Sequence, residues 1–564
     1  MKLYSRSIWQ RSSAILMLVA MLSVQGIAQM AAKTATVTKP ASLSKVEREL
    51  TRNISLDSIK AYTNALASDE MEGRGTMQPG GDKAANWIAD KFKDLGLKPL
   101  GDNGTYLQLI NFKQTEMAPE TTFQVGDEKF KLGKEYGFTP LPFKKSDKNI
   151  TADMVFVGYG TQAFNTGASA DALGNIRGKV VVYINGPPAN FDKERWDKMN
   201  GQSLIFQSLA VGGAKALVVL GNGRKDDQID TYVDYFGRRQ ISLADEKPAY
   251  APIPIPPMIM ITRATAEKLF SKSGAEFKDL MVQAEAKDFK PINLNQQATI
   301  VEKYKTSTGT SSNVAGYIEG SDPKLKAEAV LFSAHYDAYG IENGQIFNGA
   351  ADNALGTSEM IAVAEAYSKM KPKPKRSMIF LAVTGEEYGL YGSKYWADNP
   401  TWELSKIAGN LNLDGIGTEV YGPVKNMVGF GAEHSTLGAM LEDVAKSYGI
   451  KLMPDPQPEE KVFTRSDHYS FVKKGIPALM LMGAPEGTKE EIVAKIKAWE
   501  KVNYHQPTDD VMDNWHWEGA KTVADMMGIL GLRISNQEKA PTWLSTSEYS
   551  KIDRNPATEP NDKN

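Results

Sequence analysis

The second half of the chain shows a pattern of apolar and polar positions that predicts strands separated by helices. Four short apolar runs have the length of buried strands: 329–333, 378–383, 410–413 and 477–482. Between the first two runs, Met360, Ile361 and Tyr367 recur at helical spacing, and Ser358 is the expected N-cap of a helix over 358–370. Strands that alternate with helices predict an α/β fold with a mostly parallel sheet flanked by helices.

The first half predicts a helical lead-in followed by an inserted β-rich domain. Apolar residues between Asp57 and Leu97 recur at helical spacing, and Gly96 is the expected end of the last helix. Short β-rich runs separated by turn residues follow. We therefore expect three units, namely a helical lead-in over 45–118, an insertion over 119–296 and the rest of the main domain over 297–536. Residues 537–564 are polar and proline-containing, and predict a loosely ordered tail.

Length and charge narrow the range of functions. A chain of 564 residues is too long for one hydrophobic core, which agrees with an insertion into a larger domain. A formal net charge of -2 argues against a nucleic-acid partner, because such partners require a strongly basic face. The chain has no cysteine, so any metal site must be built from histidines and carboxylates.

The N-terminus has the pattern of a signal peptide. Lys2, Arg6 and Arg11 precede an apolar stretch over 14–28, which is shorter than the roughly 20 residues of a membrane-spanning helix. Small residues near Ala28 suit cleavage. We expect a signal peptide over 1–28, a linker over 29–44, and export to the periplasm or the extracellular medium without stable membrane insertion. An uncleaved anchor is the alternative.

Histidines and acidic residues follow the predicted strands at their carboxyl ends. The segments that carry them are "VLFSAHYDAYG", "NGAADNALGTSEM", "IFLAVTGEEYGLYGS", "NLNLDGIG" and "KVNYHQPTDD". Because loops at the carboxyl ends of parallel strands line one crevice, we expect these side chains to meet there. His335 and Asp337 suit a metal ligand with its orienting carboxylate. The adjacent Glu386 and Glu387 repel each other unless a divalent cation lies nearby, and one can then bind metal while the other moves protons.

In order and local context these segments resemble the co-catalytic di-zinc exopeptidases, a family that includes bacterial secreted aminopeptidases and glutamate carboxypeptidase. The resemblance covers about residues 50–118 and 300–535, with "SSNVAGYIEG" typical of a strand that leads in. It implies a hydrolase that holds two zinc ions per chain and acts on peptide substrates. The implied metal ligands are His335 and Asp414 for one zinc, Glu387 and His505 for the other, and Asp352 for both.

The same resemblance implies roles for residues around the metals. Glu386 matches the general base, Asp337 the partner that orients His335, and Tyr504 a tyrosine that contacts the substrate or the oxyanion. In "TRSDHYSF", three consecutive side chains cannot converge on one reacting atom as a serine triad does. We therefore expect Asp467 and His468 either to line the substrate pocket or to support the metal ligands from behind.

The inserted region carries a second resemblance. The segments "GYGTQ", "IRGKVVVYINGPP" and "AVGGAKALVVLGN" are similar to a protease-associated domain, a module that is not itself catalytic. In the lead-in, we expect "MEGRGT" around Arg74 to position the helices.

Three functions remain open from the sequence. The first is a zinc aminopeptidase. The second is a carboxypeptidase of the glutamate carboxypeptidase type, or a relative that cyclises N-terminal glutamine. The third is a non-catalytic binding protein on the same scaffold. A free amine requires acidic neighbours beside the metals, whereas a substrate carboxylate requires a cation such as Arg465.

Overall fold

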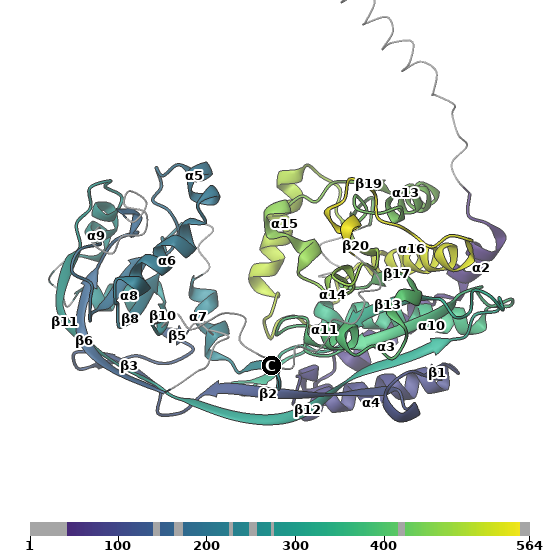
Figure 1. Ribbon diagram of the computed structural model, residues 1–564, viewed down its shortest axis with the longest axis horizontal. Helices are drawn as coiled ribbons and strands as arrows, with labels where there is room; N and C mark the ends of the chain where they lie inside the picture. The colour runs from purple at the N-terminus through teal and green to yellow at the C-terminus, as the bar shows by residue number, and fades with distance from the viewer. Residues whose placement is uncertain are drawn as a thin grey trace, which may run out of the picture.

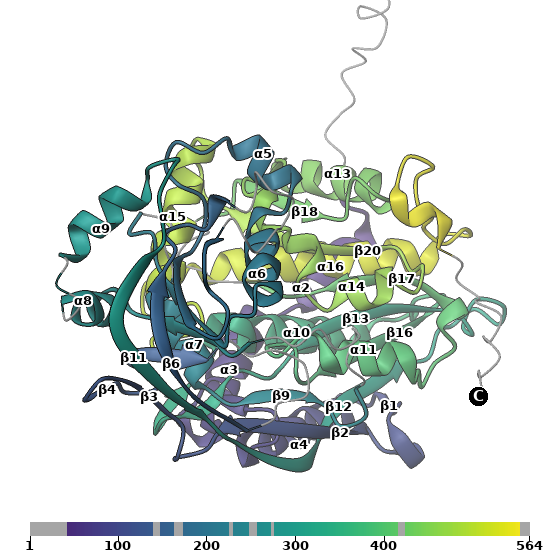
Figure 2. The same cartoon turned by 60° about the vertical axis from the view of Figure 1, so that its left-hand side comes forward.

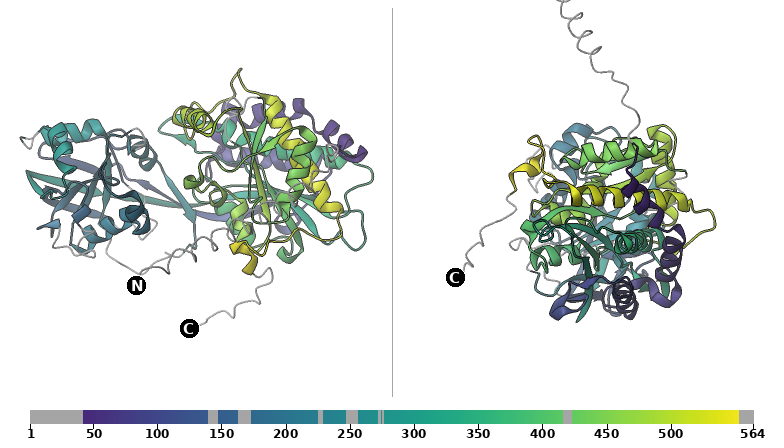
Figure 3. Two further views of the ribbon diagram at one scale, coloured as in Figure 1. Left: turned by 90° about the horizontal axis from the view of Figure 1, so that it is seen from above. Right: turned by 90° about the vertical axis from the view of Figure 1, so that its right-hand side faces the viewer.

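The computed structural model describes residues 42–138, 147–162, 173–224, 229–246, 256–271, 274, 276–415 and 423–552. The predicted signal peptide, most of the predicted linker and the end of the predicted tail lie outside these ranges. The described residues form two lobes, each built on its own sheet (Figure 1; Figure 3, left). Within these ranges, no helix combines the length and apolarity needed to cross a membrane.

The larger lobe contains a ten-stranded sheet. Its order is β19 (Lys451–Leu452), β18 (Asn426–Phe430), β20 (Ala478–Ala484), β17 (Ile407–Asn412), β13 (Ala329–His335), β16 (Ser377–Val383), β12 (Tyr304–Ile318), β2 (Leu107–Met117) and β9 (Gln240–Leu243), with β1 (Lys98–Pro99) paired to β12. The central strands β20, β17, β13 and β16 run parallel, and antiparallel strands flank them on both sides. This confirms the predicted α/β fold.

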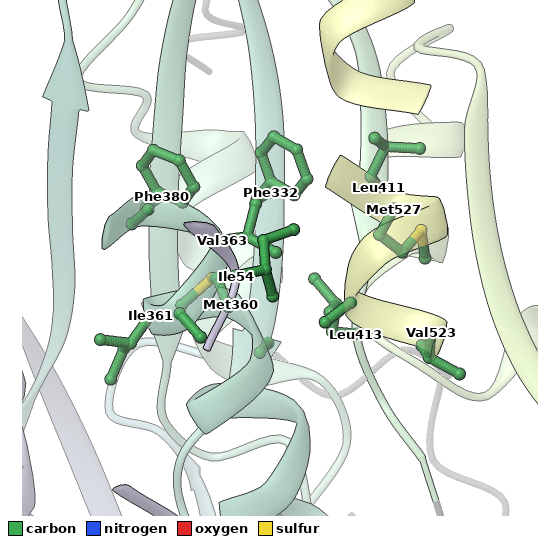
Figure 4. Close-up of a cluster of buried hydrophobic side chains, with 14 of the residues drawn as sticks. Ile54, Phe332, Met360, Ile361, Val363, Phe380, Leu411, Leu413, Val523 and Met527 are labelled. Carbon is green, nitrogen blue, oxygen red and sulfur yellow. The ribbon is translucent and has the colours of Figure 1, made fainter. Parts of the chain in front are cut away.

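Helices cover both faces of this sheet. One face carries α2 (Lys45–Asn53), α3 (Leu56–Leu66), α4 (Pro79–Asp94), α10 (Leu355–Lys369), α13 (Leu437–Tyr448) and α16 (Trp517–Asn536), and the other carries α11 (Tyr391–Asp398) and α14 (His468–Val472). Successive residues of β13 alternate between the two cores: Phe332 faces α10 and α16, whereas Leu331 faces α11. The rings of Phe332 and Phe380 stack at 5.2 Å in the first core (Figure 4).

The smaller lobe contains an eight-stranded sheet made from the inserted region. Its order is β4 (Glu128–Lys129), β3 (Thr122–Val125), β11 (Ile292–Glu302), β6 (Lys148–Phe156), β7 (Val180–Ile184), β8 (Ala216–Leu220), β10 (Met258–Ile261) and β5 (Tyr136–Phe138). Its helices are α5 (Lys193–Lys198), α6 (Gly201–Val211), α7 (Ile229–Gly237), α8 (Arg263–Ser271) and α9 (Phe277–Ala284). Strands β6 and β11 curve across this lobe in Figure 2.

Two features differ from the expected domain boundaries. The predicted boundary between 296 and 297 falls inside β11, so the smaller lobe extends to Glu302. The short strand β9 lies within the insertion in sequence, yet it pairs with β2 at the edge of the larger sheet. The long pair β2 and β12 runs from one lobe to the other (Figure 1). The lobes are therefore connected by these two strands and by the chain that leads from α7 into β9.

Two local predictions are wrong. Ser358 is not an N-cap, because α10 begins at Leu355 and the Ser358 hydroxyl donates to the Ala354 carbonyl oxygen inside the helix. The side chain of Asn353 instead accepts a hydrogen bond from the Gly356 N–H. The tail packs on the fold as far as Ile552, since the Trp543 indole donates to the Gly475 carbonyl oxygen at 2.9 Å. The predicted helix end at Gly96 is confirmed, with a φ of 72°.

Candidate metal centre and active site

The candidate site lies where three neighbouring parallel strands end. His335 is the last residue of β13 and pairs in register with Val383, the last residue of β16. Glu386 and Glu387 follow β16 after Gly385, whose φ of 72° turns the chain sharply. Asp414 follows β17, the other neighbour of β13. Parallel pairing thus brings the histidine and carboxylates from all three strand ends to one edge of the sheet.

One half of the site is centred on His335. Its Nε2 atom lies 3.2 Å from Asp352 Oδ1, 3.3 Å from Asp414 Oδ1 and 4.0 Å from Glu386 Oε2. The His335 side chain is buried, with an exposed fraction of 1%. Ser466 donates a short hydrogen bond to the second oxygen of Asp414, which fixes the orientation of that carboxylate.

The other half is centred on His505, in the loop after α15 (Lys489–Val502). Its Nε2 atom lies 3.0 Å from Glu387 Oε2 and 3.4 Å from Asp352 Oδ2. The two oxygens of Asp352 therefore face different histidines, Oδ1 toward His335 and Oδ2 toward His505. A carboxylate with this orientation is suited to bridge two cations.

The donor set fits a divalent metal. Ligand atoms of His335, Asp352 and Glu387 lie within 4.8 Å of one another, and so do those of His335, Glu386 and Asp414. Imidazole nitrogen with carboxylate oxygen is a common ligand set for zinc where thiolates are absent. The structure thus brings together all five residues that the resemblance names as metal ligands, with Glu386 beside them.

Asp337 supports this cluster in a different way from the one expected. The Nδ1 atom of His335 lies 3.2 Å from the main-chain oxygen of Asp337 and 3.8 Å from its carboxylate. That carboxylate instead accepts hydrogen bonds from the Glu386 N–H and from the Thr76 hydroxyl, both at 3.2 Å. Asp337 therefore orients His335 through its backbone and holds the loop of Glu386 through its side chain.

Two supporting residues were not identified from the sequence as part of the site. Asp509 accepts hydrogen bonds from the N–H groups of Ala351 and Asp352, at 2.9 and 3.1 Å, and so fixes the segment that carries the bridging carboxylate. Its position just after His505, in a segment already singled out, was the available signal. Arg74 is fully buried and donates to the main-chain oxygens of Tyr336, in the loop after His335, and of Gly349, in the segment before Asp352.

The electrostatics of the cluster favour bound cations. Burial alone would lower the pKa of His335, but Glu386 and Asp414 raise it well above its usual value. In the same way, Glu387 and Asp352 outweigh burial and raise the pKa of His505 to about 9. Burial opposes ionisation of Asp352, yet hydrogen bonds from the two histidines hold its pKa below the usual range. Without metal, the neighbouring carboxylates therefore keep both histidines protonated. Metal ions would displace these protons when they bind.

A pocket opens beside the metal cluster. Its wall is mostly apolar and consists of Val428, Phe430, Val462, Met480, Met482, Ile496 and Trp499. Asp455, Glu460, Glu500 and Arg465 also line it. Arg465 lies 3.4 Å from Glu460, so its charge is partly compensated. The pocket therefore joins an apolar surface to a net negative charge at the metal site.

The remaining predicted residues fall in two places. Tyr504 lines the pocket, and its ring stacks on that of His505 at 3.6 Å. Asp467 and His468, which we expect either in the pocket or behind the metal ligands, are not among the residues that line the pocket. Both are completely buried, and the His468 ring packs against Phe463 at 5.0 Å, while the preceding residues Arg465 and Ser466 line the pocket. Asp467 and His468 begin α14, which turns their side chains into the interior.

The comparison with protein families agrees with this geometry. The model of peptidase family M28 matches residues 313–530, a range that contains every candidate ligand and Glu386. This part of the chain is therefore similar to peptidase family M28. Curated relatives include leupeptin-inactivating enzyme 1 of Streptomyces exfoliatus, which is 28% identical over 202 residues, or 36% of this chain and 42% of that protein. Leucine aminopeptidase 2 of Arthroderma otae is 28% identical over 247 residues, or 41% of this chain and 46% of that protein.

Solved structures extend the likeness in fold to both lobes. An aminopeptidase from Aneurinibacillus sp. strain AM-1 superposes with a TM-score of 0.57 at 20% identity, over 88% of this chain and 97% of that chain. A zinc aminopeptidase from Bacillus subtilis gives a TM-score of 0.55 at 17% identity, over 88% and 98%. At these identities the likeness shows the fold. The chain spans less than half the length of the curated relatives it matches.

Proposed function

We propose that this protein is a zinc-dependent aminopeptidase that removes N-terminal residues from peptides. The observation that carries the proposal is the orientation of Asp352, whose two oxygens face His335 and His505. Such a carboxylate lies between two cation positions, each completed by a histidine and a further carboxylate. The names of similar proteins, which include leucine and zinc aminopeptidases, support the same activity.

The proposed holders of the metals follow from the contacts. His335 and Asp414 would hold one zinc, Glu387 and His505 would hold the other, and Asp352 would contribute to both. Bound zinc polarises the scissile carbonyl and lowers the pKa of water. The protein's own contribution is to fix the ligands: Ser466 orients Asp414, and Asp509 holds the backbone at Asp352.

Glu386 is the proposed general base. Burial raises its pKa well above the usual value, and Asp414 raises it further although His335 opposes this. A carboxyl group with a raised pKa accepts a proton from water more readily and returns it to the leaving amine. The bond from its own N–H to Asp337 places the side chain beside His335.

The charges of the pocket favour an amino over a carboxyl terminus. Asp455, Glu460 and Glu500 line the pocket, and the one arginine there lies 3.4 Å from Glu460. A substrate α-carboxylate would meet a net negative surface, whereas a free ammonium group would be attracted. The apolar wall beside these charges favours substrates whose first residue has a large apolar side chain.

A hydrolysis screen tests this proposal. Leucyl, phenylalanyl and glycyl dipeptides are compared with the same peptides blocked by N-acetylation or by C-terminal amidation. We expect cleavage of unblocked and amidated leucyl peptides, weaker cleavage of glycyl peptides, and no cleavage after acetylation. Cleavage of acetylated but not of amidated peptides would instead identify a carboxypeptidase.

Metal content and one variant test the mechanism. After dialysis, the protein should retain close to two zinc ions per chain. A dialysed protein that contains no zinc would refute the proposal. Glu386→Gln should keep the zinc but lose roughly 10²–10⁴-fold in kcat, the usual contribution of a positioned acid–base group. Arg465→Gln is the matched control in the same pocket, and we expect it to change KM more than kcat. Zinc binding without any hydrolysis would identify a non-catalytic binding protein.

We also propose that the protein is exported and that its smaller lobe is a protease-associated module. The basic start and the apolar stretch over 14–28 support export, and a domain of this size does not need disulfides outside the cytoplasm. N-terminal sequencing of the mature protein should begin close to Gln29. Recovery of the intact start in a membrane fraction would contradict cleavage.

A further inference from the structure

The smaller lobe contributes side chains to the metal site of the larger one. Helix α7 packs against β5 and β10 of the smaller sheet, whereas β9, only a few residues later, pairs with β2 of the larger sheet (Figure 2). Arg238 and Arg239 lie between these two elements. Both are buried, with exposed fractions of 4% and 5%, although long cationic side chains are rarely buried.

Arg239 anchors this connection next to His335. Its guanidinium forms an ion pair with Glu342 at 2.6 Å and donates to the main-chain oxygens of Thr76 at 2.5 Å and Tyr339 at 3.1 Å. Thr76 in turn bonds Asp337 through its hydroxyl group. A buried, fully bonded guanidinium of this kind has one defined position, so the neighbouring Arg238 is also held in place.

Arg238 contacts His505 directly, through the main-chain oxygen of the histidine, and indirectly through the ring of Tyr339. Both terminal nitrogens of its guanidinium lie 3.2 Å from the His505 main-chain oxygen. The guanidinium also stacks over the ring of Tyr339, with 5.0 Å from its central carbon to the ring centroid, and over that of Phe347, with 4.4 Å. His505 has a φ of 57°, in the left-handed region that non-glycine residues rarely adopt. Its backbone therefore depends on neighbours that hold it there.

Tyr339 completes the contact with the imidazole. Its hydroxyl lies 3.2 Å from His505 Nδ1, the nitrogen that faces away from Asp352 and Glu387, and the two rings meet edge to face at 4.9 Å. Tyr235 of α7 packs edge to face on Tyr339 at 6.0 Å. The partner of the outward nitrogen fixes the tautomer and the orientation of a metal-binding histidine. Here that partner is held by the smaller lobe.

We propose that Arg238 is a positioning residue for His505, acting on its carbonyl oxygen and through Tyr339, and that the smaller lobe thereby sets metal affinity at the His505 half of the site. The inference rests on the proposed two-metal function. The two halves of the site differ in this respect, because His335 is oriented within its own lobe by the Asp337 main chain. Loss of Arg238 should therefore weaken one metal position and not the other.

Zinc titration in competition with a fluorescent chelator tests this inference, using Arg238→Ala, Arg238→Lys and Tyr339→Phe in the full chain. Tyr339→Phe keeps the ring but removes the hydroxyl group that contacts Nδ1. In each variant we expect one zinc position to weaken by about 10–100-fold, the usual effect of losing such a partner, and the other to change less than twofold. Cobalt substitution should show the altered geometry as a changed visible spectrum. The double variant of Arg238→Ala and Tyr339→Phe should lose less than the product of the single losses, because both act on His505.

Arg177→Ala is the control, since Arg177 is an exposed arginine of the smaller lobe outside this contact. It should leave both zinc affinities unchanged. If Arg238→Ala does not fold, Arg238→Lys and Tyr339→Phe decide the question. A wild-type chain that binds two zinc ions and cleaves peptides, with both positions unchanged or equally weakened in the folded variants, would overturn this inference alone. A wild-type chain that binds no zinc would overturn the proposed function.

Discussion

Replacement of Arg74 by methionine should damage both stability and catalysis. The Arg74 side chain is fully buried, and its guanidinium donates to the main-chain oxygens of Tyr336, Leu66, Asn348 and Gly349, at 2.6, 2.7, 2.6 and 2.8 Å. Burial lowers its pKa to about 10, which still leaves it charged at neutral pH. Three of these acceptors belong to the metal-site loops: Tyr336 follows His335, and Asn348 and Gly349 precede Asp352.

The magnitude follows from the bonds that are lost. A buried polar group without a partner costs about 1–3 kcal/mol, and four carbonyl oxygens lose theirs in Arg74→Met. Water that enters the vacated space offsets part of this, so we expect unfolding to become easier by about 4 kcal/mol. Displacement of the metal ligands by about 1 Å should lower kcat/KM by about 10²-fold.

Arg376→Met provides a matched control. Arg376 is also fully buried and donates to the main-chain oxygens of Ile534 and Gln537, at 2.9 and 2.5 Å, and to Glu328. It directly precedes β16, at the opposite end of the strands from the site. Urea unfolding at a fixed zinc concentration measures stability, and kcat/KM is determined on the folded protein. Arg376→Met should lose comparable stability and keep kcat/KM within twofold. If Arg74→Met also keeps kcat/KM within twofold, the guanidinium does not position the ligands.

Two further changes should have effects of predictable sign. Burial lowers the pKa of His468 from 6.5 to about 4, so the unfolded chain takes up a proton below pH 6.5 that the folded chain refuses until about pH 4. The wild type should therefore lose up to about 3 kcal/mol over this interval that His468→Phe retains, and parallel pH profiles of urea midpoints would refute the assignment. Replacement of glycine by alanine inside a helix usually stabilises the folded protein by about 1 kcal/mol. A Cβ atom at Gly531, however, would lie 2.4 Å from the Phe332 ring. Gly531→Ala should thus lower the melting temperature through overpacking, whereas Gly96→Ala, which meets no atom within 4 Å, should be limited to the strain of its positive φ.

The catalytic side of the fold was predictable because its signals are local. Strand β13 ends at His335, and the buried strands β16 and β17 are followed within three residues by Glu386 and Asp414, so that their parallel pairing places these side chains together. The start of β17 was missed by a few residues, since Gly409 interrupts the apolar run while Ile407 and Ala408 belong to the strand. Ser358 was mistaken for an N-cap because it is a polar residue inside a helix that is buried on nearly every side. The sequence alone does not show that the helix has already begun at Leu355.

The contacts that support the site were not predictable from local patterns. Arg238 and His505 are 267 positions apart, and nothing near Arg238 indicates that its lobe returns to the larger sheet. Asp467 and His468 show the opposite case, in which the sequence suggests a contact with the pocket that the structure does not contain. Their residue types suit a substrate pocket, yet the start of α14 turns both side chains inward, and this depends on backbone geometry that the sequence pattern does not reveal.

The path of the insertion limits how the smaller lobe can be studied. Removal of residues 119–296, the predicted insertion, would also remove β9 from the edge of the larger sheet and the buried pair of Arg239 with Glu342. The main-chain oxygens of Thr76, Tyr339 and His505 would lose their donors together. A deletion could therefore abolish activity even if the lobe had no contact with substrate. Point substitutions at Arg238 and Tyr339 avoid this ambiguity, because they remove only the contacts around His505 and leave both sheets complete.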